Sequence, residues 1–176
     1  ITADNKPYDG NADATTHASI TSGLVAGDVV SVSSTNGLFN NKNVANGKAV
    51  TADVSKSGTD AGNYTANTSA ATTADITPIA LVIGITADNK PYDGNADATT
   101  HAAISSGLVA GDVVSVSSAN GLFNDKNVAN GKPVTADVSK SGADANNYTA
   151  NTTASATADI TPIAPVSYTH LRAHET

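Results

Sequence analysis

The stretch NKPYDGNAD, at residues 5–13 and again at 89–97, groups a lysine, a tyrosine and two aspartates around a glycine. Carboxylate and amide oxygens at such spacing could bind Ca²⁺, and a lysine beside carboxylates could transfer protons. A calcium loop of the EF-hand type needs oxygen ligands at positions 1, 3 and 5 before a glycine at 6. With Gly10 at position 6, Pro7 falls at position 3, and proline has no side-chain oxygen. The stretch does not fit this calcium motif.

Catalytic residues are not indicated elsewhere. The histidines His17 and His101 lie within predicted strands, where a solvated or packed side chain is far more common than a general base. Serines are plentiful, but no G-x-S-x-G nucleophile motif occurs, and no apolar pocket is evident that would raise the pKa of an aspartate. We expect a protein that is not an enzyme and has no catalytic residue or cofactor.

Three other kinds of chemistry remain open as alternatives. Calcium could be held between repeats by Asp4, Asp75 or Asp88. An isopeptide bond to an asparagine or aspartate could use Lys6, Lys42, Lys48 or Lys56, although these lysines are more simply exposed, solubilising charges. Glycans could be attached at the N-x-[ST] sites Asn63, Asn67, Asn147 and Asn151.

The chain is a tandem duplication with a period of 84 residues. Residues 1–80 and 85–164 align without gaps and differ at ten of eighty positions. This period is longer than the roughly 20 to 50 residues of solenoid units, so each copy is expected to fold alone. We predict two domains, residues 1–78 and 79–164. Nothing in the first copy corresponds to residues 79–84, so we expect it to lack its initial strand and to be the less stable of the two.

The charge of the chain argues against several partners. Its two repeats contain eight lysines and fifteen aspartates, so no basic surface is expected for nucleic acid or anionic lipid. The longest apolar run, at residues 79–83, is far shorter than a membrane span. The chain contains no cysteine and begins with isoleucine, and we interpret it as an internal fragment of a longer protein.

The polar and apolar residues alternate as in half-buried strands. Residues 28–34 and 48–55 alternate, as do residues 64–76, and no window has a helical period. The pairs Asn36-Gly37 and Asn46-Gly47 predict hairpin turns. About seven short strands in about 80 residues favour a β-sandwich.

Two short motifs are expected to shape each domain. The sequence Tyr-Asp-Gly, at Tyr8, Asp9 and Gly10 and at Tyr92, Asp93 and Gly94, predicts a tight corner in which glycine adopts a backbone angle that other residues resist. The sequences DAGNY and DANNY pair an aspartate with a tyrosine four residues later, at Asp60 and Tyr64 and at Asp144 and Tyr148. This spacing resembles the tyrosine corner of immunoglobulin-like domains, in which the phenol bonds to upstream backbone.

The ordered set KPYDG, GLVAGD, FNNKNVANGKAV, DAGNYT and ADITP resembles the YDG domain and the related MBG-type bacterial immunoglobulin-like repeats. Such repeats occur in tandem in large secreted adhesins, including proteins similar to filamentous haemagglutinin. The resemblance covers nearly all of residues 1–164. It implies two tandem immunoglobulin-like β-sandwich domains, located outside the cell or on the bacterial surface, without enzymatic activity.

Two functions follow from this resemblance. In the first, the repeats are a structural spacer, whose partners are neighbouring repeats of the same chain. In the second, loops such as STNGLFNNKN bind a host glycan, a neighbouring cell or biofilm matrix. Burial of Phe39 and Phe123 would favour the spacer, because a binding surface needs exposed aromatic side chains.

The end of the chain, residues 165–176, differs from the repeats. VSYTHLRAHET contains the only arginine, the only glutamate and half of the histidines of the chain. One reverse translation of it matches the transposase adapter used in short-read library preparation. We interpret this tail as mostly translated adapter, so His170 and His174 are not expected to bind metal.

Overall fold

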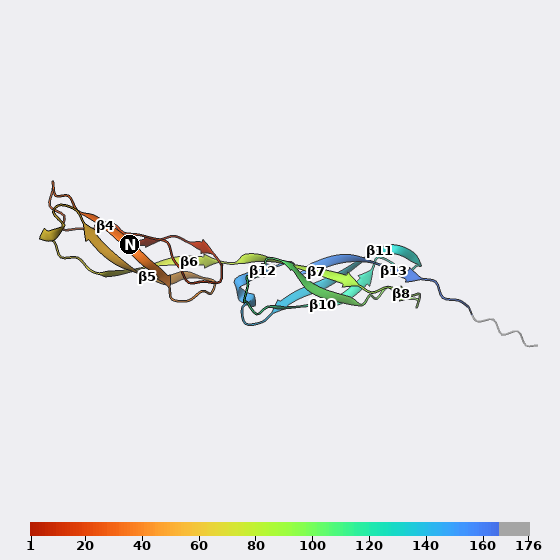
Figure 1. The fold of residues 1–176 in the computed structure, drawn as a ribbon. Helices are drawn as coiled ribbons and strands as arrows, with labels where there is room; N and C mark the ends of the chain where they lie inside the picture. The colour runs from red at the N-terminus through yellow and green to blue at the C-terminus, as the bar shows by residue number, and fades with distance from the viewer. Residues whose placement is uncertain (166–176) are drawn as a thin grey trace, which may run out of the picture. The chain divides into compact units, whose positions relative to one another are not determined.

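A computed structural model describes residues 1–165, and these residues are almost entirely β-strands and turns (Figure 1). The two helical segments, η1 (Ala61–Asn63) and η2 (Ala145–Asn147), are single 3₁₀ turns. Within residues 1–165, no helix has the length and apolar character needed to cross a bilayer. The all-β prediction is confirmed. The predicted adapter tail at residues 166–176 lies outside the described residues.

Each repeat contains a four-stranded sheet with the same order of strands. In the first repeat the order is β2-β6-β5-β4, and in the second it is β8-β13-β11-β10. The strands of the first are β2 (Lys6–Pro7), β4 (Ser31–Phe39), β5 (Ala45–Ser57) and β6 (Ser69–Thr77). Those of the second are β8 (Lys90–Pro91), β10 (Ser115–Phe123), β11 (Ala129–Ser141) and β13 (Thr153–Thr161).

The other sheet of each repeat differs between the two copies. In the first repeat it contains only β1 (Thr2–Ala3) and β3 (Thr16–His17). In the second it has the order β12-β7-β9, from β12 (Tyr148–Ala150), β7 (Ile79–Ala87) and β9 (Thr100–Ser106). The first half of β7 has no counterpart in the first repeat. The tandem sandwich-like domains and the missing initial strand are therefore as predicted.

The cores are small and built from the alternating faces of the long strands. Val50 and Ile76 are fully buried in the first repeat, as are Val134 and Ile160 in the second. One phenylalanine, Phe39 or Phe123, is buried in each repeat and supplies its largest apolar volume together with tyrosine. Because side chains alternate across a strand, these residues point to the same side of their sheet.

The prediction of hairpin turns at the Asn-Gly pairs is wrong. Asn36 and Gly37 lie inside β4, and Gly47 lies inside β5. At each pair the register of the neighbouring strand shifts, which is the signature of a β-bulge. The positive φ angles of Asn36 (52°) and Gly47 (60°) are used for the bulge. The chain reverses instead between Phe39 and Ala45, where Asn40 N–H donates to the Ala49 carbonyl at 3.0 Å.

The described residues form two compact units that do not follow the boundaries of the repeats. Unit 1 contains Ile1–Val82 together with Ile104–Ser115 and Lys140–Ala150 of the second repeat. Unit 2 contains Ile83–Ala103, Val116–Ser139 and the chain from Asn151. Unit 1 thus includes the whole of the first repeat and one end of the second.

Candidate functional site

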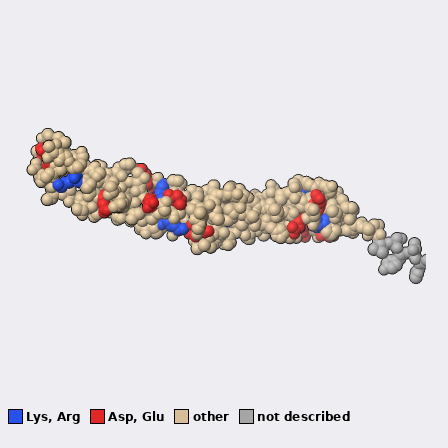
Figure 2. Space-filling view, viewed as in Figure 1, with Lys and Arg blue, Asp and Glu red and all other residues tan. Residues whose placement is uncertain are grey.

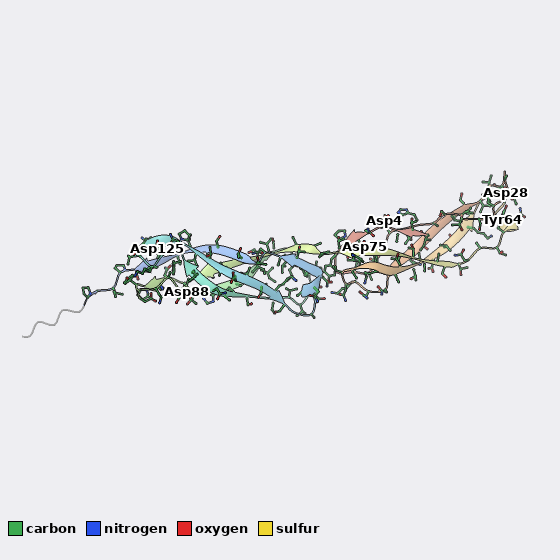
Figure 3. All side chains as sticks on the ribbon, turned by 180° about the vertical axis from the view of Figure 1, so that it is seen from behind. Asp4, Asp28, Tyr64, Asp75, Asp88 and Asp125 are labelled. Atoms are coloured by element: carbon green, nitrogen blue, oxygen red, sulfur yellow. The ribbon has the colours of Figure 1, made fainter. Side chains whose placement is uncertain are left out.

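The two tyrosine corners have the same local geometry. The Tyr148 phenol oxygen accepts a hydrogen bond from Val109 N–H at 3.0 Å and donates to Asp112 Oδ2 at 2.6 Å. The Tyr64 phenol does the same with Val25 and Asp28, at 3.0 and 2.6 Å (Figure 3). The phenol bonds to upstream backbone, as in immunoglobulin-like domains.

The aspartate of each DAGNY or DANNY motif also binds upstream backbone. Asp60 Oδ2 accepts from Val29 N–H at 2.8 Å, and Asp144 Oδ2 accepts from Val113 N–H at 2.9 Å. Aspartate and tyrosine therefore fix the same loop, GLVAGD, at two points. The corner is a local structure that each repeat can form by itself.

In unit 1, the Tyr-Asp-Gly corner of the first repeat packs on the tyrosine corner of the second. The Tyr8 phenol donates to Asp112 Oδ2 at 2.7 Å, so that two phenols share one carboxylate oxygen. The rings of Tyr8 and Tyr148 make an edge-to-face pair, with centroids 5.7 Å apart and planes at 75°. Tyr8 is only 2% exposed. We call the group formed by Tyr8, Lys42, Asp112, Asp144, Asn147 and Tyr148 the corner cluster.

Lys42 supplies the positive charge of the corner cluster. Its ammonium donates to Asp112 Oδ1 at 2.7 Å and lies 3.2 Å from Asp144 Oδ1. The ammonium also lies 5.8 Å from the centroid of the Tyr8 ring. The Asp112 side chain is 2% exposed, so its charge depends on these donors for compensation.

A backbone contact extends the cluster along the loop that contains Lys42. The Asn147 side-chain oxygen accepts a hydrogen bond from Val44 N–H at 2.9 Å. Asn147 is buried, whereas its counterpart Asn63 is exposed. The second repeat therefore bonds both the side chain and the backbone of this loop.

The titration of the corner cluster follows from these contacts. Burial raises the pKa of Asp112, but hydrogen bonds from Lys42, Tyr148 and Tyr8 outweigh it and hold the pKa below its ordinary value. Burial and the hydrogen bond to Asp112 raise the pKa of Tyr148 to about 12. The hydrogen bond to Asp112 also raises the pKa of Lys42. At neutral pH Asp112 is therefore a carboxylate, Lys42 is an ammonium, and the phenols of Tyr8 and Tyr148 are neutral.

The Tyr-Asp-Gly corners depend on a lysine in the preceding strand. Lys6 forms an ion pair with Asp9 at 2.8 Å, and Lys90 forms one with Asp93 at 2.9 Å. The glycines that follow, Gly10 and Gly94, both have φ of 84°, in the left-handed region. A Cβ on Gly10 would lie 2.8 Å from Val109 Cγ1, whereas one on Gly94 would meet nothing within 4 Å.

The counterparts of the cluster residues, 84 positions away, are not brought together in the described residues. Tyr92 is partly exposed and packs beside Phe123 and Val134, and Lys126 is exposed. The carboxylate of Asp28 bonds one side chain, Tyr64, where Asp112 bonds three. Each repeat thus contains the residues for both sides of a corner cluster. In unit 1, Tyr8 and Lys42 of the first repeat meet Asp112 and Tyr148 of the second.

Sequence reasoning identified Tyr8, Asp144 and Tyr148 as structural motif residues but missed Asp112, and it gave Asn147 only as a site for a glycan. Lys42 was considered only as an isopeptide or solubilising lysine. No local motif connects Lys42 with Asp112, which lies 70 positions away in the chain. The sequence signal was that KNV and AGD occur at equivalent positions in both repeats. Their role becomes clear only when the contact between the two repeats is known.

The alternatives that involve metal or covalent chemistry have other contacts here. His17 and His101 pair with Asp4 and Asp88, each at 3.0 Å and on the surface. The Asp75 carboxylate accepts from Gly47 N–H at 2.7 Å. Within residues 1–165, no group of three acidic or histidine side chains is placed to hold a metal ion.

None of the four lysines expected to be exposed is fully so: Lys6, Lys42 and Lys56 are partly buried and Lys48 is buried. Lys48 is 7% exposed and donates to Asn41 Oδ1 at 2.7 Å. Its counterpart Lys132 donates to Asp125 Oδ1 at the same distance. The Lys48 ammonium makes a hydrogen bond to a neutral amide, whereas the Lys132 ammonium makes an ion pair with a carboxylate. The same buried lysine position is thus satisfied by either partner. Basic groups on the face shown in Figure 2 form small separate clusters.

Comparison with known proteins gives one family match. The model of the YDG domain family matches residues 1–74 and residues 77–158. The two matches correspond to the two repeats and together contain every residue of the corner cluster. No curated protein and no solved structure matches the chain.

Proposed function

Since the chain belongs to the YDG domain family and contains two of its domains in tandem, we propose that it is a non-enzymatic spacer in a large bacterial surface or secreted adhesin. Related MBG-type repeats and proteins similar to filamentous haemagglutinin provide the setting for this proposal. The spacer holds a distal binding region away from the cell. Its partners are the neighbouring repeats of the same chain.

The observation that carries the proposal is the corner cluster. A spacer must resist independent movement of consecutive repeats, and residues of both repeats meet here around one buried carboxylate. Asp112 accepts from three side chains, two of them from the first repeat. Removing any of these donors leaves a buried charge less compensated, so separation of the two corners is costly.

A binding module that contacts a host glycan, another cell or biofilm matrix is the second candidate. It would need exposed aromatic or polar side chains gathered in a concave surface. Phe39 and Phe123 are buried, and the paired tyrosines lie inside the corner cluster. These observations favour the spacer.

Distance measurements between spin labels test the spacer directly. The chain has no cysteine, so labels can be placed at Thr59→Cys and Ala143→Cys, both at exposed positions. We expect a narrow distribution of distances that broadens in the double variant Tyr8→Ala and Lys42→Ala. The matched control, Tyr92→Ala with Lys126→Ala, should leave it narrow. A broad distribution in the unmodified chain would contradict the proposal, and saturable binding of the chain to a glycan array would favour the second candidate.

A further inference from the structure

The segment by which the chain enters the second repeat is bonded in parallel to the segment by which it leaves. In unit 2, residues 90–91 of β8 pair in parallel with residues 160–161 of β13. Tyr92 N–H donates to the Thr161 carbonyl at 2.8 Å and continues this pairing beyond β8. In unit 1, the start of β7 pairs in parallel with β12 in the same way. The entering and leaving strands are therefore neighbours that run in one direction.

Two asparagine side chains add hydrogen bonds between these segments within unit 2. The Asn151 side chain accepts from Ile83 N–H at 2.8 Å and donates to the Ile83 carbonyl at 2.9 Å. The Asn89 side chain accepts from Asp159 N–H at 2.7 Å. Each asparagine belongs to one segment and bonds the backbone of the other. We call residues 83–92 and 151–161, with the bonds between them, the parallel clamp.

The direction of the strands decides how tension along the chain loads these bonds. Tension pulls the entering segment towards its N-terminal end and the leaving segment towards its C-terminal end. In a parallel pair these two ends lie at opposite ends of the pair, so the segments must slide past each other to separate. Sliding strains all the bonds between them together. In an antiparallel pair the two ends lie at the same end, and the bonds open one after another.

Buried side chains oppose sliding as well. Ile83 of the entering segment is 2% exposed, and Ile160 of the leaving segment is fully buried. The neighbouring Val82 on the other face of β7 is 47% exposed. Because side chains alternate across a strand, a slip of one residue would move the buried side chains to the solvent face. The clamp has no nearby register in which its bonds and its burial could both be restored.

We propose that the parallel clamp is a load-bearing element, which keeps the repeat folded when the chain is under tension. This inference deepens the proposed spacer function and rests on it, because a spacer between a cell and a fixed target is pulled along its own chain. The clamp joins the two segments through which tension enters and leaves the repeat. It must therefore break before the remaining strands are loaded.

The first repeat contains the same contacts at its edge strand. Residues 6–7 of β2 pair in parallel with residues 76–77 of β6. Asp75 N–H donates to Asn5 Oδ1 at 2.7 Å, as Asp159 N–H does to Asn89. The parallel pairing of entering and leaving strands is therefore a feature of both repeats, and Asn5 provides a matched control for Asn89.

The test is the mechanical unfolding of single molecules of the full chain, held by engineered cysteines because the chain has none. Attachment at Pro78→Cys and Ile163→Cys, both at exposed positions, loads the clamp in its sliding direction. Attachment at Gly94→Cys and Ile163→Cys pulls β8 and β13 apart from one end, and a side chain at Gly94 meets nothing within 4 Å. We expect the first geometry to need several times the force of the second. Equal forces would overturn the proposal.

Variants of the clamp should unfold faster in the sliding geometry. Asn151→Ala removes two hydrogen bonds to one backbone position and should raise the unfolding rate of the second repeat about tenfold at a given force. Asn89→Ala removes one hydrogen bond and should have a smaller effect in the same direction. Asn5→Ala, in the repeat that does not lie between the attachment points, should leave this rate unchanged.

A core variant separates resistance to tension from overall stability. Val134 is fully buried in β11, outside the clamp. Val134→Ala should therefore lower the melting temperature more than Asn151→Ala does, but the unfolding force less. The proposal fails if the unfolding force simply follows the melting temperature across these variants. Narrow spin-label distances with a low unfolding force would refute load bearing and leave the spacer function, whereas broad distances with a high force would do the reverse.

Discussion

The two repeats are almost the same sequence in two different surroundings. Tyr8 and Tyr148 are buried in the corner cluster, while their counterparts Tyr92 and Tyr64 are partly exposed. β9 and β12 flank a central strand, β7, whose first half has no counterpart in the first repeat. None of the ten differences between the repeats falls on a tyrosine, lysine or aspartate of the corner cluster, although one, Gly62 against Asn146, immediately precedes Asn63 and Asn147. Neighbouring elements, and not the residues themselves, set these environments.

This comparison separates two contributions to stability within one chain. The tyrosine corner is complete in each repeat, so it depends only on residues of that repeat. The central strand and the corner cluster are complete only where another segment arrives. The experiments below therefore compare the two repeats, a residue with its counterpart or opposite-face neighbour, or the corner cluster at different pH values.

The largest expected difference is between the repeats as wholes. Leu81 and Ile83 of β7 are buried, and their burial contributes about 3 kcal/mol or more to the free energy of unfolding of the second repeat. The first repeat has no equivalent of these two side chains. We expect β5 amides to exchange hydrogen faster than the matching β11 amides in the full chain. Separate melting of residues 1–78 and 79–164 provides a second measurement. Equal protection and equal melting would show that β7 adds little.

Within β7, the two faces should respond very differently to truncation. Leu81→Ala should destabilise the chain by about 2 to 5 kcal/mol, because it removes a fully buried side chain. Val82→Ala, at a position that is 47% exposed, should cost well under 1 kcal/mol. Chemical denaturation followed by hydrogen exchange measures both. Similar costs for the two would mean that β7 is not inserted as described.

The two Tyr-Asp-Gly tyrosines should differ by one hydrogen bond to a charged group. Tyr8→Phe removes a donor from the buried Asp112 carboxylate and should cost about 1 to 2 kcal/mol. Tyr92→Phe should be nearly neutral, since only its partly buried ring packs on the core of the second repeat. Equilibrium unfolding of the two variants checks this. If Tyr92→Phe is the more costly change, the corner cluster does not hold the repeats together.

The corner cluster should weaken at both ends of the pH range. The pKa of Asp112 is lowered in the folded chain, so its contribution is present above the ordinary value of 3.8 and lost as pH falls through the folded pKa. The pKa of Tyr148 is raised from 10.0 to about 12, so its contribution is present below pH 10 and lost as pH rises towards 12. Spin-label distances from Thr59→Cys to Ala143→Cys should broaden below pH 3.8. Asp112→Asn should already be broad at pH 7 and should lose this acid dependence.

The smallest expected difference concerns the two corner glycines. Both have φ of 84°, so alanine at either position should cost about 1 kcal/mol from backbone strain. Gly10→Ala should cost about 0.5 kcal/mol more, because its Cβ would lie 2.8 Å from Val109 Cγ1. Melting temperatures of Gly10→Ala and Gly94→Ala measure the difference. A larger loss for Gly94→Ala would contradict the contact with Val109.

Local chemistry explains which parts of the fold were predictable. The alternation along residues 48–55 and 64–76 identified β5, β6 and their counterparts, because strand faces follow a period of two. Hairpin turns were predicted at the Asn-Gly pairs because such pairs readily adopt positive φ. A bulge uses the same backbone angles, and a Cβ on Gly37 would collide with the Ala14 carbonyl, so the pair lies where another segment crosses.

The amino-acid sequence alone determines the repeat, the all-β class and the two tyrosine corners. The all-β class follows from the alternation of neighbouring residues, and each tyrosine corner uses residues of one repeat only, although its bond between Tyr64 and Asp28 spans 36 positions. Only the tertiary structure decides that Tyr8 and Lys42 of the first repeat reach Asp112 of the second. Because equivalent residues of the two repeats are identical, the sequence does not show which of them will contact the other repeat. That depends on which segments pack together, and burial then sets their charge, contacts and stability.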